Sequence, residues 1–422
     1  MKCSIKWLDQ AENAAPEERA TVADFTLELS GQNVTKHLID NVLGESVTVA
    51  LYGIASGLAH DWWSIFGARD RVFSFRKYRT GYLLPDLRFS FDGAIFDIAA
   101  YQVAYSDPDL RFWGGNSESL SRDDAEAFLS ELIEEVLERL DDRGLDKTGA
   151  ALRWQRVKRS RQSQEREFCE AAGGLGLDPY QIADETAKFI EGAENVFDDE
   201  ALIEFVSGAA EVDQERLLKW VDRMVGMKGF RYRLSDLRTI VDVAQKEDPK
   251  RLNEPAWAVG YRRARAIRKQ LGIAQSDRLR SMFEIARKFG APKNYNLAPK
   301  VDGINALRRE AENGIDIHVR NHGESEEANV TNRFALARAI GDAACFPSPS
   351  TAPINRLHNA YRQAAGRAFA AEFLAPIDEI RSMRDDERDI YSIASELGVS
   401  SMTIEHQIEN NERIEEACAI PG

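Results

Sequence analysis

The sequence predicts an α+β protein, in which an N-terminal domain mixes strands with helices, the middle is helical, and a mostly helical C-terminal domain contains a small sheet. Residues that alternate between apolar and polar dominate roughly the first 115 positions, which is the period of a half-buried strand. Helical spacing then continues almost unbroken from Ala150 to about Lys250. Further on, one short alternating run stands among long helical ones. We expect domains at residues 1–118, 119–252 and 253–422.

Composition and charge restrict the class of protein. The 422 residues are 43% hydrophobic and 30% charged, as in a soluble globular protein. No run approaches ~18 apolar residues, so no membrane span is predicted, and the N-terminus lacks the apolar stretch of a signal peptide. The four cysteines lie far apart without a C-x-x-C pair, which favours a cytoplasmic location. A net charge of −15 opposes non-specific nucleic-acid binding by the molecule as a whole.

The N-terminal domain is predicted to combine several strands with one buried helix. The alternating runs are residues 25–29, 46–51, 87–91 and 94–98. Apolar residues recur every four positions through residues 51–66, which predicts a helix with a buried stripe. This helix contains Trp62 and Trp63. They could form an aromatic platform for a ligand, but their large apolar area favours burial in the core.

The middle region is predicted to be helical almost throughout. Ser121 begins a capping box, and a long acidic helix follows it to about Asp142. The glycine-rich run 173–180 marks a corner between helices. It is no phosphate loop, because no strand leads into it and no Gly-Lys-Ser/Thr follows. Further amphipathic helices are expected at residues 198–206 and 214–225.

The C-terminal domain is predicted to be built from helices and one edge strand. The strand covers residues 314–319, and its alternation is typical of a position at the margin of a sheet. The expected helices are residues 257–271, 278–289, 332–346, 354–374, 388–397 and 401–410. A loop rich in serine and proline, residues 347–353, separates the third helix from the fourth.

Several short motifs of this domain occur in a familiar order. They are a G-x-x-A-x-x-like helix from Gly260, the strand at His318, R-F-A-L-A from Arg333, F-A-A-E-F-L-A-P from Phe369, and a closing helix pair from Ile393. Residues 255–412 therefore resemble the ImmA/IrrE family, metallo-endopeptidase-like domains of phage, mobile-element and stress regulation. The resemblance implies a zincin-like fold with a metal-binding helix.

The residues that would carry the chemistry of this family have changed. A zincin helix needs H-E-x-x-H, since two histidines at i and i+4 share a zinc ion and the glutamate polarises its water. The resemblance places Arg338 and Asp342 at the two histidines, Ala339 at the glutamate, and Ala365 (or Gln363 in a neighbouring register) at the third ligand. Arg338 would put a permanent cation where zinc would sit. We expect an Arg338–Asp342 ion pair in place of the metal, with no catalytic residue and no cofactor.

A different zinc site remains an alternative. Asp342 and His358, with His318 or His322 from the strand and the loop after it, could supply one oxygen and two nitrogen ligands. His358 lies seven residues before Ala365, so the two would share a helix face. Nothing supplies a general base beside this set. The alternative for His358 is a packing or hydrogen-bonding role at the helix surface.

Two basic runs are candidates for a nucleic-acid or partner surface. Their members are Arg153, Arg156, Lys158, Arg159 and Arg161 in the first run and Arg262, Arg263 and Arg265 in the second. The alternative is a solvated helix face paired to the abundant carboxylates of the chain. Residues 393–404 read like a helix-turn-helix. Its second helix carries Glu405 and Glu409, which would repel phosphate, so we expect it to pack against the domain core.

The resemblance and the altered ligands together suggest a regulatory function. The expected protein is a catalytically inactive, peptidase-like interaction protein of a bacterial or phage-related defence, toxin–antitoxin or stress-response module. Its partner would be a protein, with a segment bound in a groove between the helices at residues 332–346 and 354–374. Two alternatives remain: a divergent metallo-endopeptidase that cleaves a repressor-like partner, and a nucleic-acid-binding module that uses the basic helices.

Overall fold

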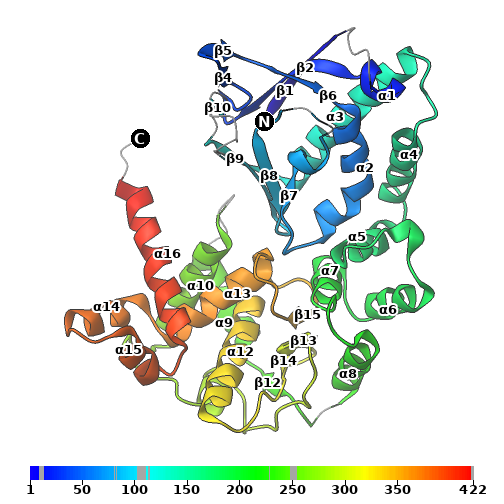
Figure 1. The fold of residues 1–422 in the computed structure, drawn as a ribbon. Helices are drawn as coiled ribbons and strands as arrows, with labels where there is room; N and C mark the ends of the chain where they lie inside the picture. The colour runs from blue at the N-terminus through cyan, green and yellow to red at the C-terminus, as the bar shows by residue number, and fades with distance from the viewer. Residues whose placement is uncertain are drawn as a thin grey trace. The chain divides into compact units, whose positions relative to one another are not determined.

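The computed structural model has helices and antiparallel sheets, which confirms the predicted α+β class (Figure 1). It describes residues 1–8, 14–79, 81, 83–101, 111–112, 115–227, 229–247 and 254–419, without the side chains of residues 247 and 414–419. The chain divides into two compact units, Met1–Ala183 and Asp184–Gly422. Each has its own apolar core. The predicted helical middle, residues 119–252, is therefore divided between the two units and is no separate domain.

The described residues of unit 1 form three antiparallel sheets. In the first, β2 (Val22–Leu29) pairs with β1 (Lys2–Trp7), β3 (Gln32–Asn33) and β6 (Val47–Ala50). The second has the order β11 (Ser117–Ser121), β9 (Ile95–Tyr101), β8 (Asp86–Phe91) and β7 (Phe73–Ser74), and the third has the order β10 (Arg111–Phe112), β4 (His37–Ile39) and β5 (Val42–Gly44). The four runs predicted as strands lie in β2, β6, β8 and β9 and extend beyond them by at most one residue at either end, because their alternation matches the pleat of a sheet with one buried face.

The helices of unit 1 pack around α2, which provides much of the core. They are α1 (Pro16–Ala20), α2 (Tyr52–Gly67), α3 (Arg122–Asp142), α4 (Gly149–Arg161) and α5 (Arg166–Gly174), with the 3₁₀ turns η1 (Phe75–Lys77) and η2 (Pro179–Gln181). The side chains of Trp62 and Trp63 are 1% exposed, so burial is confirmed and the ligand platform is wrong. Ser121 caps α3 as predicted: its Oγ accepts a hydrogen bond from Asp124 N at 3.1 Å.

Unit 2 surrounds a four-stranded sheet with helices. The sheet has the order β12 (Tyr232–Leu234), β14 (Gly314–Val319), β13 (Ala306–Ala311) and β15 (Thr351–Ile354). The helices are α6 (Asp184–Glu194), α7 (Asp199–Ser207), α8 (Gln214–Gly226), α9 (Leu237–Glu247), α10 (Ala256–Gln270), α11 (Met282–Lys288), α12 (Glu326–Cys345), α13 (Tyr361–Leu374), α14 (Ile377–Asp385), α15 (Ile390–Leu397) and α16 (Ser401–Ala419). Within the described ranges, no helix has the length and apolar character needed to cross a membrane.

Several sequence predictions in unit 2 are wrong, since one strand was expected where the sheet has four, and the helix expected at residues 278–289 begins only at Met282. The predicted edge strand, β14, is an inner strand with all of its residues buried, because β12 from the supposedly helical middle covers its outer side. The predicted helix at residues 354–374 begins only at Tyr361. Residue 354 is the last residue of β15, which pairs with β13 at the edge of the sheet, and residues 355–360 form a loop. Pro353 is tolerated there, since a marginal strand does not need every backbone donor.

Helix α13 lies between α10 and α12 and makes the closest helix contacts of unit 2 (Figure 1). A Cβ atom on Gly260 of α10 would come within 2.7 Å of Phe369 N and closer still to Ala365 O. On the other side, a Cβ atom on Gly341 of α12 would come within 2.6 Å of the Phe369 side chain. Because α10 and α12 have glycine where they cross α13, the helices come so close together that a larger side chain there would collide with α13. The groove expected between α12 and α13 is therefore filled at this crossing by direct contact.

Candidate functional site

Arg338 occupies the position at which the resemblance places the first metal-binding histidine. Its side chain is buried, and NH2 donates hydrogen bonds to Asn355 O at 2.8 Å and to Gln363 Oε1 at 2.9 Å. Burial, with the neighbouring charge of Arg367, lowers the pKa of Arg338 to about 9. The guanidinium therefore remains a cation at neutral pH. The positive charge of Arg338 therefore lies beside Gln363, near the start of α13.

Asp342, one turn further along α12, is held by two other arginines. Arg308 Nε of β13 donates to Asp342 Oδ2 at 2.7 Å, and Arg362 NH2 of α13 contacts the two carboxylate oxygens at 2.8 and 3.0 Å. The predicted Arg338–Asp342 ion pair is therefore wrong. The order of charges explains this result, because a cation placed four residues before an anion is the less favourable orientation on a helix. Arg308 and Arg362 approach from other elements without that constraint.

Glu204 of α7 is a component of this region that the sequence analysis missed. Its side chain is fully buried, and Oε2 accepts a hydrogen bond from Gln363 Nε2 at 2.7 Å. Asn355 Nδ2 donates to the backbone oxygen of Glu204 at 2.8 Å. Burial raises the pKa of Glu204 to about 7, although the charge of Arg362 opposes the change. The available signal was its place inside the apolar run Ala-Leu-Ile-Glu-Phe-Val, where a solvated glutamate is not expected.

We call these side chains the buried polar network. Its members, which come from α7, β13, α12, α13 and the loop between β15 and α13, are Glu204, Arg308, Arg338, Asp342, Asn355, Arg362 and Gln363. Three arginines face two carboxylates, and several buried N–H groups remain without a hydrogen-bond acceptor, including Arg308 NH1 and Arg362 NH1. Buried polar groups that are only partly satisfied are costly. The network is therefore sensitive to the loss of the Asp342 carboxylate, which accepts hydrogen bonds from two of the arginines.

The residues at the predicted metal positions do not fit a zinc ion. Zinc needs deprotonated donors with free lone pairs. Arg338 offers only N–H donors, and both oxygens of Asp342 already accept from arginine. Gln363 Oε1 accepts from Arg338 and from Asn355 N. Ala365, the other candidate for the third ligand, lies at the crossing with α10. The side chain that contacts Arg338 is that of Gln363.

The alternative zinc set is not brought together. His358 lies in the loop before α13 and is exposed, so it does not share a helix face with Ala365. His318 is buried, its Nδ1 lies 3.0 Å from Phe230 O, and burial lowers its pKa to about 4. His322 contacts Asn332 Oδ1 through Nδ1 at 2.7 Å. Across the described residues, no group of three or more His, Cys, Asp and Glu side chains has an arrangement that could hold a metal ion.

The first basic run lies on α4, and carboxylates neutralise most of it. Arg153 NH1 lies 2.8 Å from Asp178 Oδ1, Lys158 Nζ lies 3.1 Å from Glu134 Oε1, and Arg161 NH2 lies 2.8 Å from Glu126 Oε2. The two other members, Arg156 and Arg159, are exposed. The Arg156 guanidinium lies over the Tyr180 ring, 4.1 Å from its centroid. The paired helix face is therefore the better description of this run.

The second basic run is no open patch, because Arg263 is buried and the other two members are paired with carboxylates, although Arg265 itself is exposed. Arg263 is 4% exposed. Arg262 Nε donates to Glu254 Oε1 at 2.9 Å, and Arg265 Nε donates to Glu372 Oε1 at 2.7 Å. The expected surface is wrong here because α10 packs against α13, which turns these side chains toward acidic partners.

The closing helix pair packs on the domain as predicted. Gln407 of α16 is buried, and its Nε2 donates to Glu372 Oε2 and to Ala375 O, each at 2.9 Å. Arg333 of α12 donates to the Leu397 and Gly398 carbonyl oxygens at the end of α15. Both helices therefore contact the interior of unit 2, as expected for packing and not for DNA reading.

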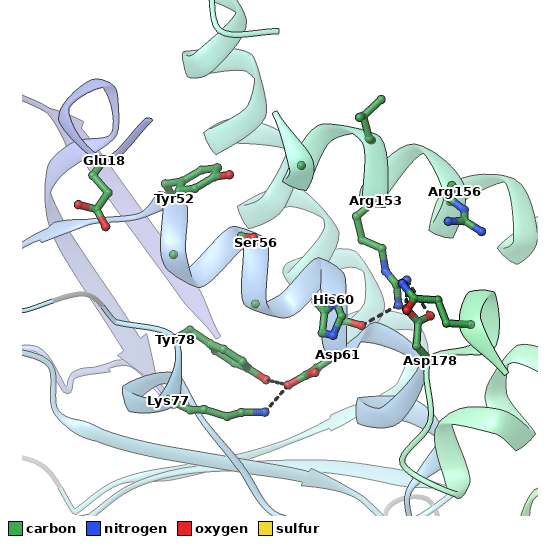
Figure 2. A pocket seen from close by; sticks show the side chains of 15 residues that line it. Glu18, Tyr52, Ser56, His60, Asp61, Lys77, Tyr78, Arg153, Arg156 and Asp178 are labelled. Atoms are coloured by element: carbon green, nitrogen blue, oxygen red, sulfur yellow. Dashed lines mark hydrogen bonds and ion pairs between the residues drawn. The ribbon is translucent and has the colours of Figure 1, made fainter. Parts of the chain in front are cut away.

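A separate candidate site is a pocket of about 750 Å³ in unit 1 (Figure 2). Its floor is one face of α2, from which Tyr52, Ser56 and His60 project. Lys77 and Tyr78, at the end of η1, form one wall. The other wall is the start of α4 together with η2 and the residues around it, and includes Leu152, Arg153, Arg156 and Asp178. The sequence analysis did not propose this site, because its residues are brought together from five separate segments.

Most charges of the pocket are already paired. Asp61 Oδ2 accepts from Lys77 Nζ at 2.7 Å and from Tyr78 Oη at 2.8 Å. Burial, followed by the charge of Asp61, raises the pKa of Tyr78 above its ordinary value, so its hydroxyl stays protonated. Both carboxylate oxygens of Asp178 accept hydrogen bonds from Arg153 NH1. Burial opposes ionisation of Asp178, but the Arg153 hydrogen bond outweighs it and lowers the pKa of this carboxyl.

Comparisons with family models, with curated proteins and with solved structures find no match for this chain.

Proposed function

We propose that unit 2 is a catalytically inactive, peptidase-like module and that the protein is a regulatory protein that acts by binding a protein partner. The resemblance to the ImmA/IrrE family suggests a bacterial or phage-related defence, toxin–antitoxin or stress-response setting in the cytoplasm. The observation that carries the proposal is the hydrogen bond that the buried Arg338 donates to Gln363. Both residues stand at positions for which the family resemblance implies zinc ligands.

The surrounding contacts support the same proposal. A water-activating zinc needs an open coordination position and a general base beside it. Here Ala339 replaces the base, and the Asp342 carboxylate is enclosed by Arg308 and Arg362. Displacing these arginines to admit a metal would leave two buried cations without their counterion. The network therefore stabilises a closed arrangement that has no group for peptide hydrolysis.

Thermal unfolding of the full-length protein with excess zinc or with a chelator tests this proposal. A ligand that binds the native state raises the melting temperature, since it stabilises that state by mass action. We expect the same melting temperature in both conditions, for the wild type and for the control His358→Ala. A rise with zinc that disappears in His358→Ala or in Asp342→Asn would support the divergent metallo-endopeptidase instead.

A further inference from the structure

The pocket of unit 1 is elongated along α2. Its floor residues run from Tyr52 to Asp61, and nine steps along a helix cover roughly 13 Å. Glycine keeps parts of its lining bare: a Cβ atom on Gly149 would meet no other atom within 4 Å. The Tyr78 ring lies where a side chain on Gly57 would otherwise be. A narrow, extended ligand fits this shape better than a compact one.

The charges that remain without an ionic partner lie at opposite ends of the pocket. Glu18 lies beside Tyr52 at the start of α2, and Arg156 lies beyond His60 at the other end (Figure 2). Within the described part of the chain, neither side chain forms an ion pair. The Arg156 guanidinium is positioned by the Tyr180 ring, which leaves its N–H groups available to an acceptor. Tyr52 and the exposed Leu152, which also line the pocket, offer apolar surface.

This distribution selects a zwitterion over a polyanion. A nucleotide concentrates two or more negative charges at its phosphates, whereas Lys77 and Arg153 of the pocket lining are already paired with Asp61 and Asp178, which leaves Arg156 as the available guanidinium. A ligand with one negative end and one positive end meets a complementary charge at each end. Four residues of extended peptide span about 13 Å, which matches the floor.

We propose that this pocket binds a short, extended peptide of about four residues with free ends. Its terminal carboxylate accepts hydrogen bonds from Arg156, and its terminal amine pairs with Glu18. The side chains lie against Tyr52 and Leu152. The proposal does not depend on the function proposed for unit 2, because the pocket is built entirely from residues of unit 1.

Retention of a mixture of tetrapeptides tests the proposal. The full-length protein is incubated with random tetrapeptides that carry free ends, separated by gel filtration, and the retained peptides are measured by mass spectrometry. We expect retention of this mixture and at least tenfold lower retention of the same mixture with amidated C-termini, because a charge-assisted hydrogen bond is lost. Acetylated N-termini should weaken binding in the same way.

Substitutions of residues that line the pocket test whether the peptides bind there. Arg156→Gln should reduce retention at least tenfold, and Glu18→Gln should abolish the preference for a free amine. Gly149→Leu, which places a side chain into open space, should exclude the peptides without a clash in the protein. The matched control is Arg159→Gln, an exposed arginine on the same helix that does not line the pocket.

Four results would overturn the proposal. They are no retention of the free tetrapeptides, equal retention of the amidated mixture, unchanged retention by Arg156→Gln, and retention of ribonucleotides in place of peptides. Each of these results can be distinguished from a failure of the proposal for unit 2, because that proposal is tested by zinc binding and not by peptide binding.

Discussion

Arg308 Nε of β13 donates a hydrogen bond to Asp342 Oδ2 of α12 across 2.7 Å, with both side chains withdrawn from solvent. This contact ties the sheet of unit 2 to α12. Arg362 approaches the same carboxylate from α13. Asp342 therefore joins three elements, and its charge is needed by two buried cations.

Removing the charge of Asp342 should destabilise unit 2 strongly. Asp342→Asn leaves Arg308 and Arg362 buried without their counterion, which typically costs about 3–5 kcal/mol. Urea unfolding of the variant and the wild type measures this change. The matched control is Asp386→Asn, since Asp386 is exposed and its loss should cost less than about 0.5 kcal/mol. Equal stability of the two variants would show that the network is not structural.

Glu204 should make unit 2 more stable in mild acid. Burial raises the pKa of this carboxyl from 4.5 to about 7, so the folded state holds a proton that the unfolded state has released. The resulting stabilisation is complete below pH 4.5 and is lost as the pH rises through 7. A difference of 2.5 pH units corresponds to about 3 kcal/mol. Glu204→Gln should remove this component.

The pH experiment compares the wild type with Glu204→Gln by urea unfolding at pH 5 and pH 8. The free energy of unfolding of the wild type, relative to the variant, should be higher at pH 5. The control is Glu215→Gln, because Glu215 is an exposed residue of α8. If the difference between wild type and Glu204→Gln is constant over this range, the carboxyl does not titrate there.

The helix crossing at Gly260 should not accept even one methyl group. In Gly260→Ala the new Cβ would collide with the backbone of α13 at Ala365 and Phe369, and overpacking of this kind costs about 1–3 kcal/mol. Gly226→Ala is the matched control, since a Cβ there meets no atom within 4 Å. Differential scanning calorimetry should show a lower melting temperature for the first variant only. An unchanged melting temperature of Gly260→Ala would mean that the crossing is looser than described.

Nucleic-acid binding through the first basic run should be absent at physiological salt. Carboxylates already neutralise Arg153, Lys158 and Arg161, which leaves two exposed cations on a protein of net charge −15. An electrophoretic shift assay with duplex and single-stranded probes measures this. A salt-dependent shift that is lost in the double variant Arg156→Gln/Arg159→Gln would instead support the nucleic-acid hypothesis.

The sequence predicted elements whose pattern repeats locally. The strands β8 and β9 were predictable because each alternates over one buried face, and Trp62 was assigned to the core from its size and spacing. Strand β15 was not, since three of its four residues lie in the serine- and proline-rich stretch 347–353 that was expected to be a loop, and they pair with β13 from a distant part of the sequence. The inner position of β14 was missed for the same reason, because β12 comes from a distant segment.

The candidate sites depended still more on distant contacts. The resemblance singled out Arg338 and Asp342, and their spacing on one helix predicted that they would pair, but their partners come from α13, β13 and the loop after β15. Glu204 lies more than a hundred residues before Gln363, and no local pattern joins them. The pocket of unit 1 collects residues between Glu18 and Gln181. Such sites are determined by tertiary packing and not by a short motif.

Elemental analysis of the full-length protein, purified without chelator and equilibrated with zinc, tests the central claim most directly. The claim is that buried arginines have replaced the metal of the peptidase-like unit. It predicts no stoichiometric zinc after desalting, in the wild type and in Asp342→Asn alike. One equivalent of zinc that remains bound to the wild type and is lost in Asp342→Asn would contradict it.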